Sequence, residues 1–142
     1  MIDSREQLLT EKDLHQCVGQ VRRYWGAHLH VHISSVSAPR MDWRVVEIPP
    51  EYKFWSHDEL LQTLLHEWGH RTICPLSPER GAILRKAAEK EGLTQKQAQH
   101  VVNMACDLWL DRQYLQDPTW NTVYWDGKRT SIRKLIGSLG PE

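Results

Sequence analysis

The sequence predicts a single α+β domain in which several helices pack against a small β-sheet. Its length of 142 residues suits one hydrophobic core. Most of the chain places apolar residues at helical spacing, whereas residues 28–36 alternate and residues 40–48 are rich in Val, Ile and Trp. No repeat, low-complexity tract or linker interrupts this pattern, so we expect one domain over residues 1–142.

The first helix is predicted from a capping pattern near the N-terminus. Thr10 is followed three positions later by Asp13, and the helix should run from there to about Trp25 and end at Gly26. Its inner face is expected to carry Leu14, Cys17, Val18 and Val21.

Two strands should follow the first helix. Residues 28–36 form the first, residues 40–48 form the second, and a turn at residues 37–39 separates them. The second strand should stop at the proline pair of residues 49 and 50.

A second helix is predicted from Ser56 to Arg71, because Ser56 and Glu59 form a capping-box pattern. Its apolar stripe comprises Leu60, Leu61, Leu64, Leu65 and Trp68. Two more helices should cover residues 77–90 and 94–115, each opened by a Ser or Thr cap. The tail is expected to turn at residues 126–127 and to form a short helix over residues 131–139.

The motif that carries chemistry lies on the second of these helices, where residues 66–70 read His-Glu-Trp-Gly-His. Positions i and i+4 share one face of a helix, so His66 and His70 can bind the same Zn²⁺. Glu67 flanks that face and can act as the general base, taking a proton from water and passing it to a leaving amine. This HExxH arrangement predicts metal-assisted hydrolysis, most often of a peptide bond.

Two histidines leave zinc without a third protein ligand. Asn103, Asp107 and Asp111 recur at intervals of four and should share one helix face. Asp107 is the first candidate for the ligand, with Asn103 and Asp111 orienting the histidines from either side. His100, three residues before Asn103, is the second candidate.

These two segments resemble the metallopeptidase domains found beside von Willebrand type A domains, in which an HExxH helix precedes an Asn-x-Ala-x-Asp helix. The resemblance covers residues 41–115, and Asp111 departs from it because that position is commonly Asn. It implies a zincin-like fold, in which a helix carrying the motif and a second ligand-bearing helix pack on a small sheet. It also implies a site composed of His66, His70 and Asp107 as ligands and Glu67 as base.

Other residues invite alternative interpretations. His28, His30 and His32 would share one face of a strand and could bind a metal themselves, although a polar strand face is the simpler interpretation. Cys74 and Cys106 lie near the expected site and are interpreted as small core residues. A donor should also stabilise the transition state. Candidates are Tyr124, Tyr114, Arg71, Arg112 and His100.

Composition excludes several classes of function. The formal net charge is zero, which predicts no general attraction to nucleic acid or to acidic membranes. The basic cluster, taken as a solvated face, comprises Lys128, Arg129, Arg133 and Lys134. No apolar run approaches the roughly 20 residues of a membrane span, and the polar N-terminal residues lack the apolar core typical of a signal peptide. Three widely spaced cysteines fit a reducing compartment, so we expect a cytoplasmic protein.

Together these observations predict a metallopeptidase with one Zn²⁺ that acts on a protein or peptide, with a regulatory protein partner as one way to restrain it. Residues 41–48 could line the cleft and pair with an extended substrate, or could form an interior strand. The alternative functions are a zinc-stabilised adaptor without turnover and a metal-free helical interaction protein.

Overall fold

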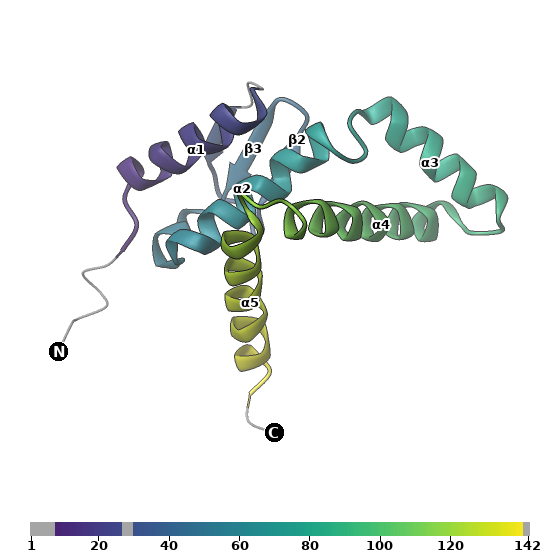
Figure 1. Cartoon of the computed structure of the whole chain (residues 1–142). Coiled ribbons are helices and arrows are strands. Elements are labelled where there is room, and N and C mark those ends of the chain that lie inside the picture. The colour runs from purple at the N-terminus through teal and green to yellow at the C-terminus, as the bar shows by residue number, and fades with distance from the viewer. Residues whose placement is uncertain (1–7, 27–29, 141–142) are drawn as a thin grey trace.

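The computed structural model describes residues 8–26 and 30–140 and has an α+β architecture (Figure 1). Helix α2 (His57–Thr72) lies at the centre, where α1 (Glu11–Trp25), α4 (Gln95–Leu115) and α5 (Asn121–Ser138) all contact it. Helix α3 (Pro78–Lys90) packs against α4, and the pair extends to one side of α2. The predicted fold class is therefore confirmed at the level of helices on a small sheet.

The sheet has three strands, of which two come from the segment predicted as one. Strands β2 (Arg40–Asp42) and β3 (Val45–Ile48) are antiparallel, and β1 (His30–Ile33) pairs with β3 in parallel, giving the order β1-β3-β2. The prediction of one strand over residues 40–48 was wrong because the backbone reverses at Trp43, whose φ is +34°. This reversal leaves β2 at an edge of the sheet.

The starts of helices α1 to α4 were predicted correctly because capping is a local interaction. Capping boxes open α1, α2 and α4 at Thr10, Ser56 and Thr94, and Ser77 caps α3. A short 3-10 helix (Pro50–Phe54), which was not predicted, joins β3 to α2. In α2 the expected apolar stripe is buried and forms the central part of the hydrophobic core, which α1, α5 and the sheet complete.

The C-terminal segment differs from its prediction. Residues 121–138 form one continuous helix, α5, without a turn at residues 126–127. A Cβ at Gly127 would lie 2.5 Å from the carbonyl oxygen of Asp58 and 2.6 Å from Cβ of Gln62. Gly127 therefore permits close packing of α5 on α2. The glycine that predicted a turn is instead required by this contact between helices.

Three members of the basic cluster make ion pairs within the molecule: Arg129 pairs with Asp126 on the same helix, and two lysines pair with residues on other helices. Lys134 Nζ lies 2.7 Å from Glu59 Oε1 at the start of α2, and Lys128 Nζ lies 3.4 Å from Asp111 Oδ1 on α4. They hold α5 against the two helices that carry the sequence motifs. Among the described residues, no helix combines the length and apolar character needed to cross a membrane.

Candidate metal centre

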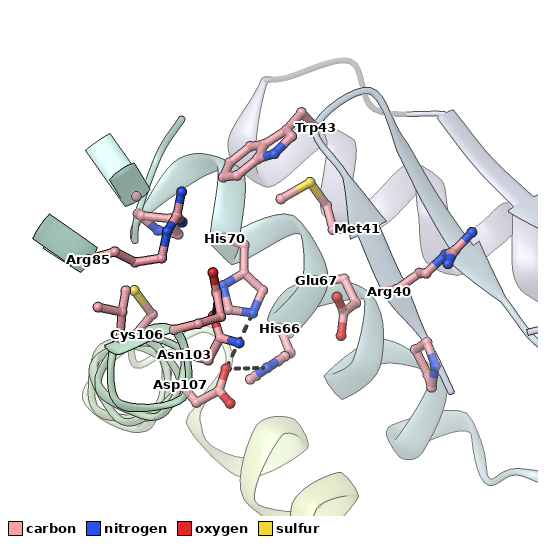
Figure 2. Close-up of a pocket in the computed structure, with 15 residues that line it drawn as sticks. Arg40, Met41, Trp43, His66, Glu67, His70, Arg85, Asn103, Cys106 and Asp107 are labelled. Atoms are coloured by element: carbon pink, nitrogen blue, oxygen red, sulfur yellow. Dashed lines mark hydrogen bonds and ion pairs between the residues drawn. The ribbon is translucent and has the colours of Figure 1, made fainter. Parts of the chain in front are cut away.

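The two motif helices bring three metal-ligand side chains together (Figure 2). His66 and His70 project from successive turns of α2, and Asp107 approaches from α4. Asp107 Oδ1 lies 3.1 Å from Nε2 of His66 and 3.3 Å from Nε2 of His70. One donor atom from each residue lies within 4.8 Å of the other two, so this group could hold a metal ion.

The hydrogen bonds behind the two histidines determine which ring nitrogen faces the centre. His70 Nδ1 lies 3.0 Å from the carbonyl oxygen of Cys74, which can only accept, so Nδ1 donates. Tyr124 gives its own hydroxyl proton to Asp111 Oδ1, at 2.6 Å. His66 Nδ1 must therefore donate to the hydroxyl oxygen of Tyr124, at 3.2 Å. In each neutral imidazole, the unprotonated Nε2 then points at Asp107.

This arrangement needs a positive charge between its three acceptor atoms. Two imidazole lone pairs and a carboxylate oxygen repel one another unless protons or a metal ion lie between them. Protonating both rings would place two cations side by side, because the ring centroids of His66 and His70 are 5.0 Å apart. Two imidazole nitrogens and one carboxylate oxygen are an ordinary ligand set for zinc and related divalent metals. The donor set therefore fits the ion that the sequence predicts.

When no metal is bound, the same contacts shift the pKa values of His70 and Asp107. Burial by itself lowers the pKa of His70, but the hydrogen bond that protonated His70 donates to Asp107 and the charges of Glu67 and Asp107 outweigh it, so the pKa is raised. Burial raises the pKa of Asp107, and its hydrogen bonds with both histidines more than reverse this, so the pKa lies well below 3.8. Asp107 is therefore ionised across the neutral pH range.

Tyr124 supports the centre from behind His66. Its side chain is fully buried and stacks on Tyr114 at a centroid distance of 4.8 Å. Burial, followed by the hydrogen bond to Asp111, raises the pKa of Tyr124 far above its ordinary value, so it remains a donor. Because Lys128 forms an ion pair with Asp111, a continuous series of polar contacts runs from His66 through Tyr124 and Asp111 to a lysine at the surface. Asp111 thus acts on His66 through Tyr124, a link that sequence spacing did not indicate.

A cavity of about 370 Å³ opens over the three ligands. Strand β2 and Trp43 form one wall, and α3 and α4 form the opposite wall (Figure 2). The charged and amide side chains that line it are those of Arg40, His66, Glu67, His70, Arg85, Gln99, Asn103 and Asp107.

Glu67 lines this cavity and has no hydrogen bond or ion pair with any other described residue. Burial raises its pKa, and the nearby charges of His66 and His70 oppose that rise only in part. Of the two carboxylates that line the cavity in the described part of the chain, Glu67 is therefore the one without a partner, and its pKa is raised where that of Asp107 is lowered.

The predicted transition-state donors do not line the cavity. The hydroxyl of Tyr124 is used on His66 and Asp111, and that of Tyr114 donates to the carbonyl of Leu65 at 2.8 Å. Neither Arg71, Arg112 nor His100 is among the lining residues. Arg85 and Asn103 line it instead. Arg85 was missed because no local pattern links it to residues 66–70, and only the packing of α3 on α4 brings it there.

The remaining candidates lie elsewhere. His100 is exposed and lines a separate hollow on α4, so it is Asp107 that joins the histidines. Asn103 lies in the cavity, but its side chain accepts a hydrogen bond from Gln99 at 2.9 Å. His30 and His32 are exposed on β1, and His28 lies outside the described residues. Among described residues, no second group of three potential ligands converges.

Searches with protein-family models, against curated proteins and against solved structures find no match to this chain.

Proposed function

We propose that this chain is a zinc-dependent metallopeptidase in which Glu67 is the general base. The observation that carries the proposal is the convergence of Nε2 of His66, Nε2 of His70 and Oδ1 of Asp107 beside a carboxylate with no partner of its own. A site with a purely structural metal has no use for an unengaged carboxylate in that position.

In this proposal, His66, His70 and Asp107 would hold the ion, and Glu67 would move a proton. A bound zinc ion would polarise the substrate carbonyl and lower the pKa of water. Glu67 would take a proton from the attacking water and deliver it to the leaving amine, and its raised pKa makes it a stronger base than an ordinary glutamate. Asn103 and Arg85 line the cavity and could donate hydrogen bonds to the developing oxyanion.

The edge of the sheet favours an extended peptide as the substrate. β2 is the last strand in the order β1-β3-β2, and its residues Arg40 and Met41 line the cavity. The outer side of such a strand presents main-chain donors and acceptors that a peptide can pair with as an added strand. This pairing would lay a peptide bond across the centre with little dependence on side-chain identity.

Metal content tests the ligand set. Wild-type protein should contain about one zinc per chain by elemental mass spectrometry, and both His70→Ala and Asp107→Ala should lose it. His100→Ala is the matched control, because its exposed side chain lies outside the group, and it should keep the metal. Full metal content in Asp107→Ala together with loss in His100→Ala would refute this ligand set.

Turnover tests the role of Glu67. Wild-type protein should cleave members of a mixed peptide library, detected by mass spectrometry, whereas Glu67→Gln should keep its zinc and lose cleavage by at least about 100-fold. Glu79→Gln removes an exposed carboxylate on α3 and should cleave normally. Zinc without cleavage in the wild type would favour the adaptor, and no metal at all would favour a metal-free helical protein.

A further inference from the structure

Two of the three cysteines lie against each other beside the candidate metal centre. Sγ of Cys74 and Sγ of Cys106 are 2.7 Å apart, although 32 positions separate them in the sequence. The third thiol, Cys17, is buried in α1 with its sulfur 3.5 Å from Nε2 of His57. Because a disulfide bond needs two sulfur atoms within about 2.05 Å, only a small movement would bring Cys74 and Cys106 into bonding distance.

The two cysteines belong to the segments that carry the ligands. Cys74 follows α2, and its carbonyl oxygen accepts the hydrogen bond from His70 Nδ1. Cys106 precedes Asp107 on α4 and lines the cavity. A bond between the two sulfur atoms would therefore link Cys74, whose carbonyl oxygen orients His70, covalently to the helix that carries Asp107.

We propose that Cys74 and Cys106 form a reversible disulfide that ties α4 to the end of α2 and slows release of the metal. The bond itself depends only on the two thiols, whereas its effect on release rests on the proposed zinc site. Cys74 is half-buried and Cys106 is buried, so a soluble oxidant would meet Cys74 first.

Oxidised glutathione can serve as the oxidant in a balanced exchange. The Cys74 sulfur attacks one sulfur of the glutathione disulfide, which forms a mixed disulfide and releases one glutathione. The Cys106 sulfur then attacks the Cys74 sulfur and expels the second glutathione. The two protein thiols lose two electrons and two protons, and the two released glutathione thiols carry them away.

Intact mass and thiol counting test the bond. After treatment of the full chain with oxidised glutathione, the wild type should lose about 2 Da and keep one titratable thiol when denatured. Peptide mapping should assign the bond to Cys74 and Cys106. Cys17→Ala, the matched control, should show the same mass loss and no remaining thiol, whereas Cys74→Ser and Cys106→Ala should show only glutathione adducts. Adducts without the 2 Da loss in the wild type would overturn the proposal.

Release of zinc to a chelator tests the effect on the centre. Oxidised wild-type protein should release zinc about tenfold more slowly than reduced protein, as expected when the support of a ligand is held in place. Cys74→Ser should release zinc at one rate with or without the oxidant. Equal rates in oxidised and reduced wild type would overturn the coupling to the metal.

Thermal unfolding separates failure of this inference from failure of the proposed function. The disulfide should raise the melting temperature by about 5 to 10 °C in the presence of a chelator, because it closes a loop of roughly 30 residues. If the protein binds no zinc but shows this rise and the 2 Da loss, the proposed disulfide is supported and the proposed metallopeptidase function is refuted. If the protein binds and releases zinc but forms no disulfide, the proposed metal site is supported and the proposed disulfide is refuted.

Discussion

The hydroxyl of Tyr124 links His66, a candidate metal ligand, to the carboxylate of Asp111, which lies too far from His66 to bond it directly. Asp111 Oδ1 lies 4.0 Å from His66 Nδ1, too far for a hydrogen bond, and Tyr124 bridges the gap with contacts of 2.6 and 3.2 Å. Such partners hold the ligand ring in one tautomer and orientation. Tyr124 is therefore a positioning residue for His66.

Removing this hydroxyl should weaken metal binding and also destabilise the fold. Tyr124→Phe leaves His66 Nδ1 without its hydrogen-bond acceptor and Asp111 with Lys128 alone, so zinc affinity should fall about 10- to 100-fold and the free energy of unfolding by about 1 to 3 kcal/mol. Competition with a fluorescent chelator measures the affinity, and urea unfolding measures the stability.

Tyr114→Phe is a matched control for that substitution. Tyr114 is also buried, stacks on Tyr124 and donates a hydrogen bond, but its acceptor is the carbonyl oxygen of Leu65. It should lose a similar amount of stability and retain its zinc affinity. Equal losses of affinity in the two variants would mean that Tyr124 acts only through packing.

Arg85 is the cavity cation available to a substrate. Arg40 forms an ion pair with Glu47, whereas Arg85 has no carboxylate partner among the described residues. Its side chain packs over Gly81, where a Cβ would lie 3.2 Å from the guanidinium nitrogen. On the proposed function, we expect cleaved peptides to carry a carboxylate near the scissile bond.

Matched peptides test this expectation. Replacing Asp or Glu by Asn or Gln, or amidating the C-terminus, should lower kcat/KM about 10- to 100-fold in wild type at the position that Arg85 contacts. Arg85→Gln should abolish that preference, whereas Lys86→Gln, on the exposed side of α3, should retain it. A preference that survives in Arg85→Gln would assign it to another group.

At the scale of elements, the packing of α5 on α2 depends on one missing side chain. Gly127→Ala should improve the helix propensity of α5 by about 1 kcal/mol. The added Cβ would nevertheless lie 2.5 Å from the carbonyl oxygen of Asp58, so the helices would have to separate. We expect a net loss of about 1 to 3 kcal/mol in the free energy of unfolding, measured by urea titration.

Gly137→Ala provides the comparison within the same helix. No atom lies within 4 Å of a Cβ built at Gly137, so the substitution should stabilise α5 by up to about 1 kcal/mol. Stabilisation by both substitutions would show that α5 does not pack closely on α2 in solution.

At the scale of the whole molecule, the candidate centre joins α2 to α4, so stability should depend on pH and on metal together. Without metal, the raised pKa of His70 means that its protonated form stabilises the fold. That contribution is complete below the ordinary value of 6.5 and is lost as the pH rises through the raised pKa. With zinc, protons compete for the same nitrogen, so metal-linked stabilisation grows over that range.

Thermal unfolding across pH 5 to 9 should therefore show opposite trends. With a chelator the melting temperature should fall as the pH rises above about 6.5, and with excess zinc it should rise. His70→Gln should reduce both trends, whereas His15→Gln, on the exposed face of α1, should not. Parallel curves with chelator and with zinc would contradict a metal site that includes His70.

Much of the local structure was predictable from the sequence. The capping boxes at Thr10, Ser56 and Thr94 and the apolar stripe of α2 use contacts within one or two turns of a helix. The same is true of His66 and His70, whose shared face follows from helical geometry alone. Two of the donor atoms of the candidate centre were therefore predictable before the structure was known.

The choice between Asp107 and His100 was decided only by tertiary structure. Both lie on α4, and only the packing of that helix on α2 turns Asp107 toward the histidines and leaves His100 exposed. The sequence alone therefore determined helices α1 to α4, their caps and the shared face of His66 and His70, each of which depends on near neighbours in the chain. Tertiary structure decided the approach of Asp107 to the two histidines, the contacts of Tyr124, the presence of Arg85 in the cavity and the use of Gly127 for packing, because these depend on contacts between residues distant in sequence.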